Sequence, residues 1–309
     1  MATNSQQIMD PNLLFDPELL SRIEHLALMV SNVQSGGRLA EQRTRARGQG
    51  MEFADFKPYV AGDDLRAIDW NSYRRLGKVF VRLFEEQQAM PVYFLVDLSA
   101  SMFNETPSPR IHAALRSVMA LAAIVLAQYD SVSVFALGKQ AAQIQKSLTG
   151  RGSLPRMAQQ LSAVQSIDDA NLASALQQFA GMPMRRGLVV VLSDFFSPEG
   201  LPAISDALDT LPHAKLLVQL TQPWDQQPQL HPQVNSSGAD VRFQDCETLS
   251  VTDVVLSPKV LKAYQEVYQA FNDELTHYAQ SRQAGLIPLD CQSDIVEQLS
   301  DWFAQGVNL

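Results

Sequence analysis

PVYFLVDLSASM, residues 91–102, joins an apolar run to a polar loop. Residues 92–96 are β-branched, aromatic or aliphatic, which is typical of a strand buried on both faces of a parallel sheet. Asp97, Ser99 and Ser101 follow at alternate positions, ahead of a predicted helix over residues 110–128. Open α/β sheets bind ligands at the carboxyl ends of their strands, so this loop is the first candidate site.

The three polar side chains of this loop indicate a metal ion. One carboxylate with hydroxyls and waters suits a hard octahedral cation such as Mg²⁺ better than it suits zinc. A structural interpretation stays open beside it. Asp97, Ser99 and Ser101 could instead cap the following helix and satisfy loop amides without any ion.

The chain from residue 91 onward alternates between strand and helix patterns. Asp194 stands at the carboxyl end of an apolar strand over residues 187–193. The alternation predicts a doubly wound, mainly parallel sheet with right-handed crossovers, of the Rossmann-like kind. Further helices are expected over residues 153–164, 172–182 and 198–211, and further strands over residues 131–137 and 213–220.

The regular alternation breaks after residue 221. Residues 222–238 predict a long loop, and an inserted hairpin is expected from residues 240–243 and 248–252, so the insertion spans about 222–256. Ser257 and Pro258 then fit the N-cap and first turn of a helix to residue 282. A strand over 286–289 and a helix over 294–303 are expected to close the domain.

Residues 1–90 are predicted to form an N-terminal extension of a domain that covers 91–309. A helix over residues 17–34 should end at Gly36 and Gly37. An arginine-rich loop over residues 38–47 is either solvated or a docking surface for an acidic partner. Short extended pieces over 51–53 and 56–60, a turn over 61–64 and a strand over 79–84 are expected to form an exposed ribbon.

Composition excludes several classes of protein. The 309 residues are 46% hydrophobic and 18% charged, which predicts a globular chain with one substantial core. A net charge of −9 argues against non-specific nucleic-acid binding, and two cysteines cannot build a disulfide framework. Residues 1–18 lack a signal-peptide pattern and the apolar run 118–127 is too short for a membrane span, so we expect a cytoplasmic protein.

An enzyme remains the alternative class. A magnesium-dependent phosphoesterase could use Asp97 as its nucleophile, although the position of Ser99 then lacks the second aspartate common in such enzymes. The five histidines have no spacing that suggests a metal site or a triad. No GxxxxGK[ST] loop is present, so the chain is not itself an ATPase.

Two motifs resemble known families. Asp97, Ser99 and Ser101 look like the Asp-x-Ser-x-Ser metal-ion-dependent adhesion motif of von Willebrand factor A domains, and Asp194 matches its second aspartate. GMEF at residues 50–53 and YVAGDDLRAIDW at residues 59–70 resemble the signature of the bacterial family called domain of unknown function fifty-eight. The resemblance covers roughly residues 40–300.

The resemblance implies a binding module that is not an enzyme. Family members are similar to von Willebrand A partners of MoxR-type AAA+ ATPases, which implies chaperone-like assembly or activation of a client protein. The implied cofactor is Mg²⁺ or Mn²⁺ at Asp97, Ser99, Ser101 and Asp194. Ala170 stands where the adhesion motif has a threonine ligand, so Asp168, Asp169 or Asn171 would have to substitute.

Overall fold

The computed structural model describes residues 15–38, 51–60, 68–86, 90–104, 109–128, 130–167, 169–231, 234, 240–246 and 250–305. The chain divides into two units, one of Met1–Asn32 with Met90–Leu309 and one of Val33–Ala89. The predicted turn over 61–64 and nearly all of the predicted basic loop over 38–47 lie outside the described residues.

A six-stranded sheet in the order β10-β7-β6-β3-β4-β5 forms the centre of the larger unit. All neighbouring pairs are parallel except β4 with β5, which confirms the predicted mainly parallel α/β architecture. The strands are β3 (Pro91–Asp97), β4 (Ser131–Leu137), β5 (Ala141–Thr149), β6 (Leu188–Ser193), β7 (Ala214–Thr221) and β10 (Gly285–Asp290).

Strand β5 was not expected from the sequence. It is an edge strand with only three buried side chains, Ala141, Gln145 and Leu148, and its register against β4 shifts twice. Half-exposed edge strands lack the continuous apolar run that identified β3 and β6.

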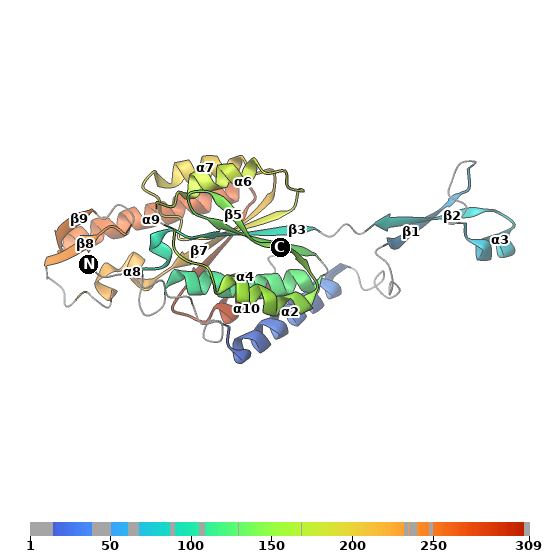
Figure 1. The fold of residues 1–309 in the computed structure, drawn as a ribbon, viewed down its shortest axis with the longest axis horizontal. Coiled ribbons are helices and arrows are strands. Elements are labelled where there is room, and N and C mark those ends of the chain that lie inside the picture. Colours follow the sequence, from blue (N-terminus) through green and yellow to red (C-terminus); the bar gives the residue numbers. More distant parts are fainter. Residues whose placement is uncertain are drawn as a thin grey trace. The chain divides into compact units, whose positions relative to one another are not determined.

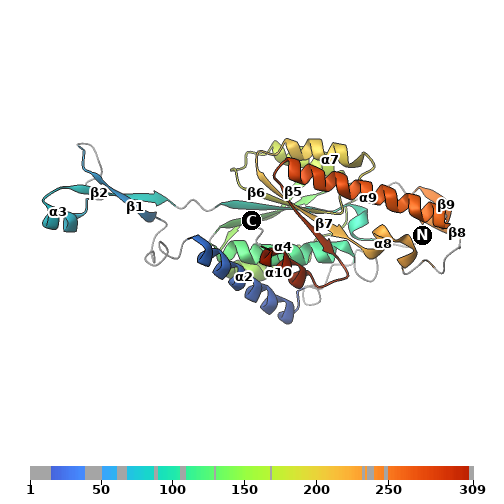
Figure 2. The ribbon, with the colours of Figure 1, turned by 180° about the vertical axis from the view of Figure 1, so that it is seen from behind.

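Helices cover both faces of the sheet (Figures 1 and 2). The face with Phe94 packs against α2 (Pro17–Arg38), α4 (Arg110–Ala127), α5 (Leu154–Leu161) and α10 (Ile295–Ala304). The face with Leu95 packs against α6 (Leu172–Ala180), α7 (Gly200–Asp209) and α9 (Pro258–Ser281). Successive residues of β3 thus enter two separate cores, as a strand buried on both faces requires.

Helix α2 as far as Asn32 belongs to the larger unit, although the sequence placed it with the extension before residue 90. Ile23 and Leu26 are buried in the same core as Phe94. The helix continues through Gly36 and Gly37, so the prediction that these glycines end it was wrong. Burial of one helix face stabilises a helix more than the helix propensity of single residues does. The tendency of glycine to end a helix therefore does not decide where α2 ends.

Arg22 of α2 forms a two-bond ion pair with Asp294, which also caps α10 by accepting from the Glu297 amide at 2.9 Å. We expect Asp294→Ala to lower the free energy of unfolding by about 1–2 kcal/mol, because it removes both cap and ion pair. Asp294→Asn keeps an accepting oxygen and should cost less than about 1 kcal/mol. Urea titrations measure both free energies of unfolding. Equal losses in Asp294→Ala and Asp294→Asn would contradict the expected difference between the two variants.

Helix α4 is long and apolar enough, by length and composition alone, to cross a membrane, in contrast to the estimate from residues 118–127. Its mean hydropathy is 1.6, and 83% of that window is buried inside the larger unit. Its apolar character is therefore accounted for by the core it fills.

The insertion after β7 is more ordered than the sequence suggested. The predicted loop contains α8 (Pro223–Gln226) and a short 3-10 helix (Pro228–Leu230). The predicted hairpin forms from β8 (Asp240–Gln244) and β9 (Val251–Val255). The Ser257 side chain caps α9 by accepting from the Val260 amide, as expected.

The smaller unit contains a two-stranded antiparallel ribbon of β1 (Met51–Pro58) and β2 (Phe80–Glu86), in the region where the sequence predicted a ribbon. β1 is one strand with a register shift between Phe53 and Asp55, where the sequence indicated two separate extended pieces. A helix that the sequence did not indicate, α3 (Trp70–Leu76), lies between the strands in the chain.

Candidate functional site

Two neighbouring parallel strands bring the predicted aspartates together. β3 ends at Asp97, and β6 ends at Ser193, directly before Asp194. Val96 is in register with Leu192, so both chains leave the sheet at the same edge. The site therefore lies at the carboxyl end of the central strands, where the sequence placed it.

Asp97, the last residue of β3, is buried and hydrogen-bonded through both of its carboxylate oxygens. It is 1% exposed, one oxygen accepts from the Ser99 amide at 2.9 Å, and the other accepts from Ser193 Oγ at 2.6 Å. Burial raises the pKa of Asp97, and these hydrogen bonds act against that rise. Ser193 was missed by sequence reasoning because a polar residue at the end of an apolar strand was interpreted only as its last position.

Ser99 and Ser101 present their hydroxyls side by side and share a hydrogen bond, with the two Oγ atoms 3.0 Å apart. Mg²⁺–oxygen bonds of about 2.1 Å place neighbouring octahedral ligands roughly 3.0 Å apart. The interpretation of this loop without an ion predicted that these side chains satisfy loop amides and cap the following helix. It is right that Asp97 satisfies a loop amide. It is wrong about the helix cap, because the N-cap of α4 is Pro109.

Asp194 has a carboxylate oxygen without a hydrogen bond. One oxygen accepts from the Phe196 amide at 3.0 Å, and Oδ2 has no hydrogen-bond partner among the described residues. The next residue, Phe195, has a positive φ of 59°, a conformation that costs a residue with a side chain about 1–3 kcal/mol. Ser193 Oγ supports that turn by accepting from the Phe195 amide at 2.8 Å.

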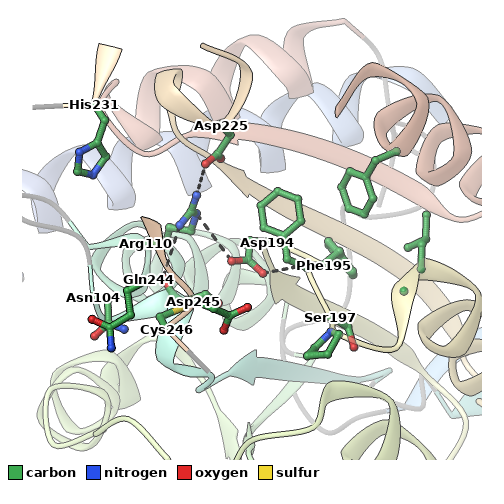
Figure 3. A pocket seen from close by; sticks show the side chains of 16 residues that line it. Asn104, Arg110, Asp194, Phe195, Ser197, Asp225, His231, Gln244, Asp245 and Cys246 are labelled. Carbon is green, nitrogen blue, oxygen red and sulfur yellow. Dashed lines mark hydrogen bonds and ion pairs between the residues drawn. The ribbon is translucent and has the colours of Figure 1, made fainter. Parts of the chain in front are cut away.

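Arg110 joins Asp194 to Asp225 of α8, and sequence reasoning found neither Arg110 nor Asp225. The Arg110 Nε lies 4.0 Å from Asp194 Oδ2, and its Nη2 donates to Asp225 (Figure 3). Asp225 also accepts from the Gln222 amide at 2.7 Å. The Arg110 and Asp225 side chains are nearly buried although 115 residues separate them, so no local pattern could reveal the pair.

Burial dominates the electrostatics of this cluster. It raises the pKa of Asp194 to about 7, with Arg110 lowering that pKa and Asp97 raising it further. When all groups are ionised, Asp97, Asp194 and Asp225 exceed Arg110 by two negative charges. Excess buried charge is unfavourable unless a proton or a cation balances it.

A cavity of about 570 Å³ opens over the cluster. Arg110, Asp194 and Asp225 point toward one another at its wall, and Asp245 lies nearby (Figure 3). Apolar side chains form another part of the lining, namely Phe195, Phe196, Pro198, Leu201 and Phe271. Asp97 is buried and does not line the cavity.

The proposed replacements for the missing threonine do not reach the cavity. Asp169 pairs with Lys139 on the surface, and Asn171 caps α6 and donates to Glu199 at 2.9 Å. Neither residue lines the cavity, nor does Ala170, and Asp168 lies outside the described residues.

The remaining groups fit a hard divalent cation. The two hydroxyls have the spacing of neighbouring ligands, Asp194 offers a buried oxygen without a hydrogen bond, and the negative charges of the cluster outnumber its positive charge. In the described part of the chain, no three Asp, Glu, His or Cys side chains gather as a metal-binding group, so hydroxyls would have to supply part of the ligand set. Waters would have to complete the ligand set, as is usual for Mg²⁺.

Residues 55–273 match the model of a family described as protein of unknown function DUF58. The chain belongs to this family. The match begins in β1, runs through the site and ends within α9. It confirms the family predicted from the Gly50–Trp70 signature and the Asp-x-Ser-x-Ser motif.

Relatives and solved structures similar to this DUF58 protein carry little functional description. Uncharacterized proteins of Mycobacterium tuberculosis and Mycobacterium bovis are each 22% identical over 283 residues, covering 90% of this chain and 87% of theirs. Conserved hypothetical protein BatB of Bacteroides thetaiotaomicron is 14% identical with a TM-score of 0.42, and the similarity covers 70% of this chain and 98% of that one.

Two further solved structures show the same low identity. An aerotolerance-related membrane protein of Bacteroides fragilis is 14% identical with a TM-score of 0.37, and the similarity covers 70% of this chain and 98% of that one. The von Willebrand factor domain of the type V pili tip protein Mfa5 of Porphyromonas gingivalis is 14% identical with a TM-score of 0.29. The similarity covers 34% of this chain and 38% of that one.

Proposed function

We propose that this DUF58 protein is a non-enzymatic interaction module that captures a carboxylate of a partner protein at a cation site. The observation that carries the proposal is the Ser99–Ser101 hydroxyl pair, 3.0 Å apart, beside the Asp194 oxygen that lacks a hydrogen bond. Ser101 and Asp194 both line the wall of an open cavity.

Each residue has a distinct role in this proposal. Ser99 and Ser101 bind the cation through their hydroxyls, whereas Asp97 and Asp194 act largely through water. Asp97 also orients the loop by accepting from the Ser99 amide. When bound, Mg²⁺ or Mn²⁺ supplies an open coordination position for a Glu or Asp side chain, a charge-assisted and geometrically selective contact.

The burial of Asp97 favours this function over the phosphoesterase alternative. A nucleophile must reach its substrate, but Asp97 is 1% exposed, lies outside the cavity lining and uses both oxygens as hydrogen-bond acceptors. The residue that faces the cavity, Asp194, already lies close to Arg110.

The partner in this proposal is a MoxR-type AAA+ ATPase, and the complex assembles or activates a client protein in the cytoplasm. The family membership supports this partner through the resemblance stated above. Co-purification with such an ATPase that weakens in Ser101→Ala would support it. Undiminished co-purification of that variant would exclude the cation site as the contact.

Thermal and urea melts in excess Mg²⁺, excess Mn²⁺ and chelator test the cation site. At 100 times its dissociation constant, a cation bound only by the folded chain stabilises it by about 2.7 kcal/mol. We expect this gain in the wild type and not in Ser101→Ala, which removes one hydroxyl at the cavity wall. Ser174→Ala, on an exposed position of α6, is the matched control.

The outcome separates the two interpretations of the loop. A gain that survives in Ser101→Ala would mean that the cation binds elsewhere. No gain in any protein with either metal would mean that the loop is structural, and the proposed function would fail. Strong phosphoester turnover abolished by Asp97→Ala would instead establish the enzyme.

A further inference from the structure

The short helix α3 of the smaller unit exposes three large apolar side chains. Trp70 is 61% exposed, Tyr73 45% and Leu76 65%. They stand three residues apart, so they share one side of the helix. No residue of α3 is buried, so its side chains add nothing to a core.

The chain nevertheless fixes this helix at both ends. Asp69 accepts from the Asn71 amide at 3.3 Å and from Ser72 Oγ at 2.6 Å. Gly77 ends the helix with φ of 65°, and its amide donates to the Tyr73 carbonyl at 2.9 Å. A surface ordered before binding loses less entropy when a partner arrives.

Contacts to β2 anchor the start of the helix. The Asp69 amide donates to the Phe80 carbonyl at 2.9 Å, and Ile68 forms an isolated bridge with Val81. Ile68 and Val81 are both buried. Ile68 and Val81 thus pack inward, while Trp70, Tyr73 and Leu76 remain outside.

The exposed surface of the helix is positively charged. Arg74, Arg75 and Lys78 are exposed, and the only acid between residues 69 and 78 is the buried cap, Asp69. Among the described residues, none of the three cations forms an ion pair. This local charge is opposite to the net charge of −9 of the whole chain.

We propose that this α3 surface, Trp70, Tyr73 and Leu76 with Arg74, Arg75 and Lys78, binds another protein at an apolar pocket bordered by carboxylates. Trp, Tyr and Arg are the residues enriched at the energetic centres of protein interfaces. The cations select an acidic partner by charge complementarity. The proposal goes beyond the cation site, because this contact needs no metal and no residue of the larger unit.

A protein explains the composition of the surface better than a membrane does. Interfacial membrane helices bind through a long apolar face, whereas α3 has 7 residues and offers three apolar side chains. An apolar pocket can enclose Trp70, and carboxylates at its border can pair with the flanking arginines.

The test selects short random peptides displayed on phage against the full chain, in chelator, after depletion on Trp70→Ala. Recovered peptides should combine Asp or Glu with large apolar residues. Labelled peptides should bind the wild type in fluorescence polarisation and weaken at high salt. Trp70→Ala should raise the dissociation constant roughly tenfold or more, and Arg74→Ala with Arg75→Ala should raise it mainly at low salt.

Val267→Ala is the matched control, because Val267 is a 70% exposed valine on α9. It should leave peptide binding unchanged. Failure to recover acidic apolar peptides, or binding that Trp70→Ala does not weaken, would overturn the proposal. So would Trp70-dependent binding to anionic phospholipid vesicles, or a Trp70-dependent dimer in sedimentation, since each assigns the surface to another occupant.

Peptide binding at the α3 surface is expected to be independent of the cation site. The peptides are selected in chelator, and Ser101→Ala should bind them as the wild type does. A Ser101→Ala defect alone would concern the proposed function and not this surface.

Discussion

Arg110→Gln is expected to lower the free energy of unfolding by about 3–5 kcal/mol, the usual cost of removing one member of a buried ion pair. Asp194 and Asp225 would lose the positive charge between them while they remain buried. Denaturation in urea with chelator present measures the loss. Arg156→Gln, an exposed arginine on α5, should change little.

A double variant separates charge from packing. Arg110→Gln combined with Asp225→Asn removes opposite charges together, and it should recover part of the stability that Arg110→Gln loses. If Arg110→Gln alone matched the wild type, the ion pairs would have no structural role.

The same arginine should also oppose cation binding. Its Nε lies 4.0 Å from the Asp194 oxygen that the cation would use, and a like charge at that range weakens binding by about tenfold or more. We therefore expect Arg110→Gln to bind Mg²⁺ more tightly than the wild type in calorimetry. Unchanged or weaker binding would mean that Arg110 helps to build the site.

The second large effect is a pH dependence that Asp194 introduces. In the folded chain the pKa of Asp194 is raised from 3.8 to about 7, mainly by burial, while Arg110 lowers it and Asp97 raises it further. The folded state then holds a proton that the unfolded state has lost. Stability from this group is present below pH 4 and is lost as pH rises toward 7, by about 4 kcal/mol in total.

Asp194→Asn should remove this component. We expect the difference in unfolding free energy, wild type minus Asp194→Asn, to fall steadily between pH 4 and pH 7 in chelator. Asp206→Asn, an exposed aspartate on α7, controls for general titration. A flat difference would show that Asp194 is ionised at low pH in the folded chain.

Some features of the fold follow from the sequence because their signals are local. β3 and β6 are continuous apolar runs, so their burial on both faces and the polar residues after them were predictable. The Ser257 cap follows from a few neighbouring residues. Strand β5 and helix α3 were missed, because an edge strand and a helix without buried residues have no apolar periodicity to detect.

The sequence by itself determined the α/β alternation, the position of Asp97, Ser99, Ser101 and Asp194 at strand ends, and the family. The tertiary structure alone decided that Arg110 and Asp225 complete the cluster, and that Asp194 lines the cavity while Asp97 does not. The physical reason is the range of the forces involved. Strand periodicity and capping act between near neighbours, whereas burial and ion pairing join groups that only the folded sheet brings into contact.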